Sequence, residues 1–163
     1  MTMSVTGGCQ CGAIRYAGPV RPGDAHLCHC RMCQKAVGGL FAALVGTVAG
    51  EFRFTRGTPS AFRSSAHVER GFCAACGTPL FYRETVEGHM SVTIGSLDDP
   101  QAMMPAFQVG TEARMSWFDA LPALRSFGAT EDGDPAEVAD AIKASNRQHP
   151  DHETDVWPRE ATR

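Results

Sequence analysis

Three cysteines lie within six residues of this sequence, in the stretch Cys28-His29-Cys30-Arg31-Met32-Cys33. Four more form two short pairs, Cys9 with Cys11 and Cys73 with Cys76. A structural zinc site is closed by four protein ligands, whereas a catalytic zinc keeps one position open beside three ligands. The seven cysteines therefore divide naturally into a fourfold site and a threefold site.

The fourfold site is predicted to hold a structural zinc on Cys9, Cys11, Cys73 and Cys76. A lone Cys-x-x-Cys is also typical of a redox dithiol, but several short-spaced cysteine motifs in one chain of this size favour metal binding. Two pairs so far apart in sequence would bring the start of the chain against its middle. This zinc is therefore expected to fix the fold.

The threefold site is predicted to be an open, catalytic zinc on Cys28, Cys30 and Cys33, because a tight loop can turn three such closely spaced sulfurs toward one ion. In the alternative, His26 or His29 closes this site as a second structural zinc. Three thiolates donate strongly to the metal, which suits a soft substrate sulfur better than activation of water. The ion here can be weakly held, so that purified protein carries this second zinc only in part.

Basic residues and glycines follow the threefold site. Three thiolates and one divalent zinc leave a net negative charge, which Arg31 and Lys35 would offset while holding an anionic substrate. Gly38 and Gly39 would let substrate approach the backbone closely. The alternative is that Arg31 and Lys35 are ordinary solvated charges and that the glycines serve a turn.

Four motifs in order carry a resemblance to a known family. They are Gly8-Cys9-Gln10-Cys11-Gly12, the cysteines of residues 28–33, Arg70-Gly71-Phe72-Cys73-x-x-Cys76-Gly77-Thr78-Pro79-Leu80, and Gly95-Ser96-Leu97-Asp98. From about Val5 to Phe127 the chain resembles the glutathione-dependent formaldehyde-activating enzymes and centromere protein V. The resemblance implies an all-β fold of the β-tent (Mss4-like) kind stapled by zinc. It also implies a structural zinc on the two cysteine pairs and a catalytic zinc on the threefold site.

The activity that the resemblance implies is that of a carbon–sulfur lyase acting on a glutathione hemithioacetal, as in an S-hydroxymethylglutathione synthase. One position departs from the family pattern. The family usually has a histidine several residues before an arginine and a tryptophan; Arg114 and Trp117 are present here, but Gln108 takes the place of the histidine. Glutamine forms hydrogen bonds but cannot take up a proton.

Short apolar or alternating segments separated by glycine and proline predict an all-β domain from the residues themselves. Turns are expected at 18–19 and 21–23, and residues 1–6 are expected to be loose. Asp98 is predicted either to cap a turn or to act as a general base. The expected strands cover residues 13–17, 40–45, 52–55, 62–65, 80–83 and 90–94.

The chain is expected to comprise a zinc-binding domain, residues 1–128, followed by a helix and a flexible acidic tail, residues 129–163. Asp134 as N-cap and Pro135 at the first helical position predict a helix that ends near Asn146. The first part carries eleven Lys or Arg against nine Asp or Glu, and the second carries four against nine. Neither part has the basic stripe of a nucleic-acid binder.

The tail contains two histidines and one tryptophan. His149 and His152 are expected to take no part in a site, and Trp157 is the one strong apolar anchor after the helix. The sequence has neither a membrane-length apolar run nor a signal peptide, which predicts a cytoplasmic protein. Reducing compartments disfavour disulfides, so the cysteines are expected to remain thiols or metal ligands.

The leading hypothesis is an enzyme whose partner is a small-molecule thiol or glutathione adduct, with no nucleic acid or membrane, as a monomer or homodimer. A non-catalytic zinc-binding scaffold or interaction module of the same fold is the second hypothesis. A thiol sensor that uses residues 28–33 is the third, and it requires exposed cysteines of low pKa.

Overall fold

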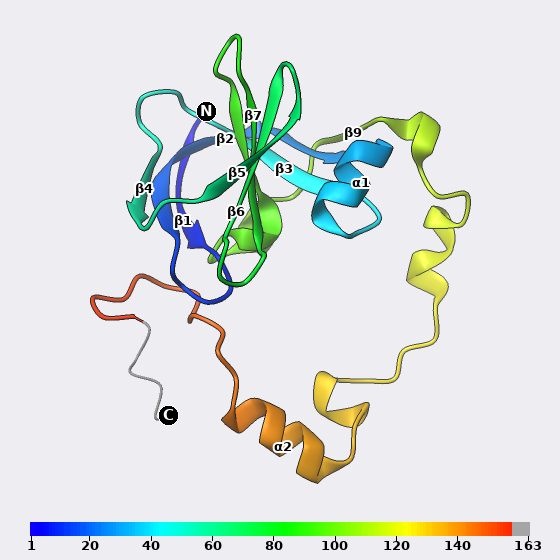
Figure 1. The fold of residues 1–163 in the computed structure, drawn as a ribbon. Helices are drawn as coiled ribbons and strands as arrows, with labels where there is room; N and C mark the ends of the chain where they lie inside the picture. The colour runs from blue at the N-terminus through cyan, green and yellow to red at the C-terminus, as the bar shows by residue number, and fades with distance from the viewer. Residues whose placement is uncertain (158–163) are drawn as a thin grey trace. The chain divides into compact units, whose positions relative to one another are not determined.

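The protein is described by a computed structural model, in which residues 1–157 can be placed. Two α-helices, α1 (Arg31–Val37) and α2 (Ala136–Ala144), accompany nine strands among these residues (Figure 1). The 3-10 turns are η1 (Ile94–Ser96), η2 (Pro100–Ala102), η3 (Thr111–Ala113), η4 (Phe118–Ala123) and η5 (Thr130–Asp132). The strands are β1 (Met3–Gly8), β2 (Arg15–Cys28), β3 (Ala42–Thr47), β4 (Arg53–Arg56), β5 (Ser60–Ser65), β6 (Val68–Phe72), β7 (Pro79–Glu84), β8 (Met90–Thr93) and β9 (Phe107–Val109).

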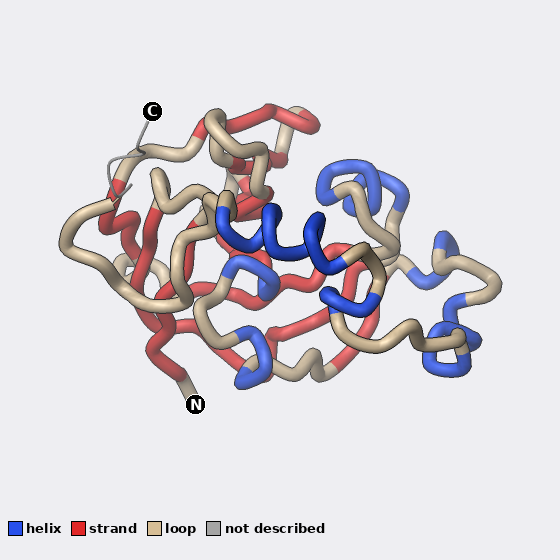
Figure 2. The backbone as a smooth tube through the Cα atoms, turned by 90° about the horizontal axis from the view of Figure 1, so that it is seen from below, coloured by secondary structure: helices blue, strands red, loops and turns tan. Residues whose placement is uncertain are grey.

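The strands form one sheet in the order β1-β2-β3-β8-β7-β6-β5, and β4 and β9 pair with β2 outside this path. Every pairing is antiparallel except that of β9 with β2, which is parallel. The strands, red in Figure 2, are joined by loops and short helical turns. The prediction of an all-β fold is confirmed.

Strand β2 corrects the turns predicted at 18–19 and 21–23, because the chain runs through both as one bent strand. Its pairing with β3 shifts register between Arg21 and His26, so a bulge accommodates Pro22 and Gly23 without reversing the chain. At Gly18 the φ angle is +150°, and a side chain there would meet the backbone of Phe52 at 2.6 Å. The long strand can therefore pair with β1, β3, β4 and β9.

Two segments are more ordered than the sequence predicts. Residues 1–6, expected to be loose, contribute to β1, which pairs with β2 from Met3↔Val20 to Gly8↔Arg15. Residues 34–37, whose sequence suits a loop or a single helical turn, belong to the longer α1, which ends at Gly38 in the left-handed conformation, with φ +65°. Pairing with a neighbouring strand orders the first segment, since a lone strand has no partner for its backbone groups.

The core lies where the central strands meet. Val20, Val45, Leu80 and Val92 are fully buried there, and Tyr16 is buried with its hydroxyl 2.7 Å from that of Ser96. Cys9 and Cys73 belong to this same buried cluster. A second cluster joins Cys33 to Ala42 and Leu44 of β3. The sheet therefore positions both groups of cysteines through apolar packing.

Contacts divide the described residues into two units: Met1–Arg114 with residues 149–157, and Met115–Gln148. The expected division at residue 128 stays a prediction. In the second unit α2 begins one residue later than predicted: Pro135, not Asp134, is the N-cap, and no side chain caps the helix. Among the described residues no helix has the length and apolar character needed to cross a membrane.

Candidate metal centres

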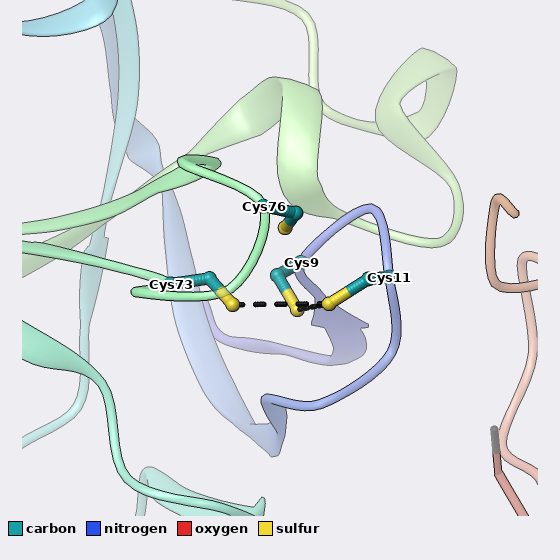
Figure 3. A group of neighbouring side chains, drawn as sticks. All are labelled: Cys9, Cys11, Cys73 and Cys76. Atoms are coloured by element: carbon teal, nitrogen blue, oxygen red, sulfur yellow. Dashed lines mark hydrogen bonds between the residues drawn. The ribbon is translucent and has the colours of Figure 1, made fainter.

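The four-cysteine group brings together two loops from distant parts of the first unit. Cys9 and Cys11 lie between β1 and β2, and Cys73 and Cys76 lie between β6 and β7 (Figure 3). Their four sulfurs lie within 4.8 Å of one another. Cys9 Sγ is 3.6 Å from Cys11 Sγ, which is 3.8 Å from Cys73 Sγ. A tetrahedron with Zn–S bonds of about 2.3 Å has edges of about 3.8 Å, so the spacing fits a closed zinc site.

Backbone hydrogen bonds fold each loop around its sulfurs. Cys9 accepts a hydrogen bond at Sγ from the Ile14 amide, at 3.2 Å. In the other loop the Gly77 amide donates to the Cys73 carbonyl at 2.8 Å, and Gly77 has a φ of +78° that favours glycine. Thr78 Oγ1 joins the loops: it accepts from the Gln10 amide at 3.0 Å and lies 3.2 Å from Cys76 Sγ.

The pKa values of these thiols explain why the four-cysteine group is suited to binding a cation. Burial raises the pKa of Cys9 to about 12. Burial would also raise the pKa of Cys76, but hydrogen bonds from Thr78 and from the Cys11 amide lower it to about 6. Closely packed thiolates repel one another, so full ionisation of the group requires a compensating cation. Four soft sulfur donors in this arrangement match a structural zinc.

The three-cysteine group, which we call the tripod, lies where β2 leads into α1. Cys28 ends the strand, Cys30 is the N-cap of the helix and Cys33 lies in its first turn. The sulfurs of Cys28 and Cys30 are 3.5 Å apart, and all three sulfurs lie within 4.8 Å of one another. The Cys33 amide donates to Cys30 Sγ at 3.4 Å. The three sulfurs are thus brought together by the end of a strand and the start of a helix, and not by the tight loop that the sequence predicts.

Neither histidine of the alternative prediction is grouped with the tripod. The groups of metal-ligating atoms found among residues 1–157 place only three sulfurs there. His29 is fully buried, and its Nε2 donates to Gln108 Oε1 at 2.8 Å. His26 Nδ1 donates to the carbonyl of Asp24 at 2.8 Å, and its ring stacks on Phe107. The donor set fits a zinc with three cysteine ligands and a fourth position for another ligand.

A cavity of about 370 Å³, which we call the tripod cavity, opens beside the three sulfurs. Arg70 of β6 and Tyr82 of β7 form part of its wall, together with Met32, Val68 and Val109. Burial raises the pKa of Tyr82, and Glu84 raises it further. Glu84, Ser64, Ser65, Ser91, His26, His89 and Leu44 complete the lining.

Arg70 provides the positive charge next to the tripod. Its Nη2 lies 3.5 Å from Cys33 Sγ, its Nε donates to Ser64 Oγ at 3.2 Å, and its guanidinium lies over the ring of Tyr82. Burial would raise the pKa of Cys30, but the amide of Cys33 and the charge of Arg70 help to lower it. In contrast, burial raises the pKa of Cys28 to about 12.

The substrate residues predicted from sequence lie elsewhere. Arg31 and Lys35 are exposed on α1, and Arg31 Nη1 donates to Gln34 Oε1 at 2.7 Å. Gly38 and Gly39 are exposed after the same helix. None of the four lines the tripod cavity. The sequence includes Arg70 only as part of a family motif. Nothing in the neighbouring residues predicts that β6 places its side chain next to Cys33.

Strand β9 pairs with the end of β2 that carries Cys28 and so supports the backbone of the tripod. The His29 amide donates to the Val109 carbonyl at 2.9 Å, beside the parallel pairing of β9 with β2. At Gly110, where φ is +66°, a side chain would lie 2.6 Å from the Cys30 amide nitrogen. Gln108, the departure from the family pattern, does not line the tripod cavity and instead accepts from His29. Gln108 therefore helps to hold the backbone between two tripod cysteines.

The sequence profile of the glutathione-dependent formaldehyde-activating enzymes matches residues 4–113. The chain belongs to this family. The matched region contains both cysteine groups and, apart from Met3 at the start of β1, all nine strands of the described residues. The resemblance inferred from the four motifs is thereby confirmed, and the two sulfur groups could each hold a metal ion in a zinc-binding protein of this family.

A solved structure shares the family fold. A crystal structure of a protein from Rhodobacter sphaeroides matches with a TM-score of 0.53 and 20% sequence identity, over 64% of this chain and 99% of that protein. At this identity the match shows the fold alone. It supports the sheet arrangement that brings the two sulfur groups together.

Residues 149–157, which we call the C-terminal strap, follow the matched region and pack on the loop of the four-cysteine site. His149 is buried, its amide donates to the Gln10 carbonyl at 2.7 Å, and its ring packs edge-on against Trp157. The Trp157 indole donates to the carbonyl of Cys11. At Gly12, where φ is +72°, any side chain would collide with both rings.

Charged side chains also tie the strap to the sheet. Arg56 donates to the carbonyl of Thr154, and Arg15 Nη2 lies 2.9 Å from Glu153 Oε1. The tail that the sequence predicts to be flexible is therefore ordered as far as Trp157, and residues 158–163 lie outside the described part. His149, expected to be uninvolved in any site, supports the loop that carries Cys11.

Proposed function

We propose that this chain is a zinc-dependent carbon–sulfur lyase that acts on the hemithioacetal of a small thiol, glutathione being the thiol that the family name indicates. One observation carries the proposal: three sulfurs converge on the wall of a cavity beside a guanidinium, with no fourth protein ligand among the described residues. Zinc bound there would accept the substrate sulfur as a thiolate and act as a Lewis acid.

The residues of the chain would position and polarise the substrate. In the cleavage direction the carbon–sulfur bond breaks, the hydroxyl oxygen becomes the carbonyl of an aldehyde, and the hydroxyl proton is transferred to sulfur. Arg70 lies next to Cys33 Sγ, so its N–H groups can donate to the substrate oxygen while the sulfur faces the tripod. A positioned, partly buried guanidinium stabilises negative charge on that oxygen more effectively than water does. The partner is a small-molecule thiol adduct.

The free state of the cysteine thiols also indicates in which cell compartment the protein works. All seven cysteines are free, and they form two groups that need reduced sulfur to bind a metal. Disulfides form readily in oxidising compartments. We therefore place this activity in the cytoplasm.

The first test combines metal content with turnover. Zinc is measured per chain for the wild type, Cys30→Ser and Cys76→Ser, and hemithioacetal formation from glutathione and formaldehyde is followed by exchange NMR. We expect one zinc for each cysteine group, loss of tripod zinc and of activity in a folded Cys30→Ser protein, and unfolding of Cys76→Ser. Unchanged turnover in Cys30→Ser would exclude the catalytic role. Full zinc content without turnover of any thiol and aldehyde pair would favour a zinc-binding scaffold.

A further inference from the structure

A second cavity adjoins the tripod cavity. It measures about 220 Å³, and we call it the apolar cavity. The two cavities share three lining residues, Leu44, Arg70 and Tyr82, which therefore lie between them. A substrate held by sulfur at the tripod would lie next to these residues.

The wall of the apolar cavity differs in chemistry from that of the tripod cavity. Arg70 is its only charged residue among the described lining residues. Thr93, its only hydroxyl besides that of Tyr82, already donates to the Pro79 carbonyl at 2.8 Å. The remaining wall is mainly apolar, with Ala36, Val37, Ala42, Phe62, Phe72 and Phe81 from α1, β3, β5, β6 and β7. Such a wall suits an apolar group and offers little to a carboxylate or an ammonium.

Arg70 lines both cavities and would therefore set the orientation of a substrate bound between them. Its Nη2 lies 3.5 Å from Cys33 Sγ, and the same residue also lines the apolar cavity. In a hemithioacetal whose sulfur faces the tripod and whose oxygen faces Arg70, the substituent on the carbon would face Leu44 and Tyr82, which line both cavities. Formaldehyde supplies only hydrogen at that carbon and would leave the apolar cavity unfilled.

We propose that the aldehyde partner carries an alkyl or aryl group that occupies the apolar cavity. This inference rests on the proposed function and specifies its substrate class. In the synthetic direction the thiol sulfur bonds to the aldehyde carbon, the carbon–oxygen double bond becomes single, and the thiol proton is transferred to the oxygen. The reaction is redox-neutral and needs no further reactant. Burial of each added methylene favours the larger substrate by roughly fourfold.

The test compares aldehydes of increasing length with one thiol. Exchange NMR measures the acceleration by the intact protein for glutathione with formaldehyde, ethanal, propanal and butanal, each relative to its uncatalysed rate. We expect kcat/KM to rise roughly fourfold per carbon until the cavity is full. In Ala36→Leu the added side chain enters the apolar cavity from an exposed helix position, and the ratio of butanal to formaldehyde should fall at least tenfold. Ala66→Leu, exposed and outside both cavities, is the matched control and should keep that ratio.

A binding measurement separates this inference from the proposed function. Butan-1-ol has neither a thiol nor a carbonyl, so shifts that it causes in the amide resonances of Val37 and Phe81 report the apolar cavity alone. Acceleration that is greatest with formaldehyde, or butan-1-ol that shifts neither resonance, would overturn the inference and leave the lyase proposal standing. No acceleration with any aldehyde would overturn the proposed function, and the inference with it.

Discussion

The Nη2 atom of Arg70 lies 3.5 Å from the sulfur of Cys33, although 37 positions separate the two residues in sequence. The contact exists because β6 pairs with β7 and places Arg70 opposite Tyr82, over whose ring the guanidinium lies. A tripod of thiolates around one divalent ion keeps a net negative charge. Arg70, on the wall of the tripod cavity, would compensate this charge.

Replacing Arg70 should weaken both metal binding and turnover. A hydrogen bond to a charged group contributes about 1.5–3 kcal/mol, so Arg70→Gln is expected to lower kcat/KM by roughly 10- to 100-fold. Arg70→Lys keeps the charge but not the planar fork, and should fall between that variant and the wild type. Cobalt titration, read through its thiolate absorption, measures the tripod affinity separately. Arg83→Gln on β7 removes an exposed ion pair with Glu69 and is the control; an equal effect there would contradict the role of Arg70.

The chemistry of the cysteines could be predicted from sequence because the ligands of each loop are close neighbours along the chain. The short spacings within Cys9/Cys11, Cys28/Cys30/Cys33 and Cys73/Cys76 limit how far their sulfurs can separate. The tripod follows from these spacings, whereas the pairing of Cys9 and Cys11 with Cys73 and Cys76 follows from dividing the seven cysteines into four and three. No such local constraint links Arg70 to Cys33, since that contact depends on the order of strands in the sheet.

Strand β2 is a feature of the fold that the local sequence also does not predict. Pro19, Pro22 and two glycines are typical of turns, yet the chain continues as a strand because β1, β3 and β4 supply hydrogen-bond partners along it. The parallel pairing with β9 joins segments about eighty residues apart and has no local sequence signal. Tertiary pairing therefore overrides turn propensity where it also positions the tripod.

The pair formed by His29 and Gln108 should stabilise the tripod backbone. His29 is fully buried and Gln108 is exposed, so Gln108→Leu removes an acceptor at the boundary between the buried ring and solvent. We expect a loss of about 1–2 kcal/mol in the free energy of unfolding, measured by chemical denaturation. Gln108→Glu retains an acceptor oxygen and should recover most of this loss. If both variants are as stable as the wild type, the hydrogen bond does not hold the loop.

The C-terminal strap should slow the release of zinc from the four-cysteine site. Trp157→Ala removes an indole that packs on His149 and donates to the Cys11 carbonyl. Because the indole is only partly buried, we expect a destabilisation of about 2 kcal/mol, less than for a core tryptophan. Transfer of zinc to a coloured chelator should become faster in this variant. Trp117→Ala, at a half-exposed tryptophan of the second unit, is the matched control and should change stability by less than about 0.5 kcal/mol.

Asp98 is neither the cap nor the general base suggested by its turn, because its carboxylate is held by the sheet. It accepts from Arg15 at 2.8 and 2.5 Å and from Thr6 Oγ1 at 2.5 Å. Burial would raise its pKa, but these hydrogen bonds hold the pKa below the ordinary value of 3.8. The folded state therefore favours the ionised carboxylate. This stabilisation is complete above pH 3.8 and is lost as the pH falls through the lower pKa of the folded state.

Asp98→Asn should consequently destabilise the protein in a pH-dependent way. At pH 7 the change leaves the buried Arg15 without its main counter-charge and is expected to cost roughly 3 kcal/mol, because the side chain of Arg15 is only 2% exposed. The difference between variant and wild type should shrink as the pH falls below 3.8, where the wild-type carboxyl also becomes neutral. Denaturation curves at several pH values measure it. Asp99→Asn is the neighbouring control: Asp99 accepts from the Ala102 amide at the start of η2, asparagine caps equally well, and little change is expected at any pH. A penalty for Asp98→Asn that is independent of pH would show that packing, and not charge, accounts for the stabilisation.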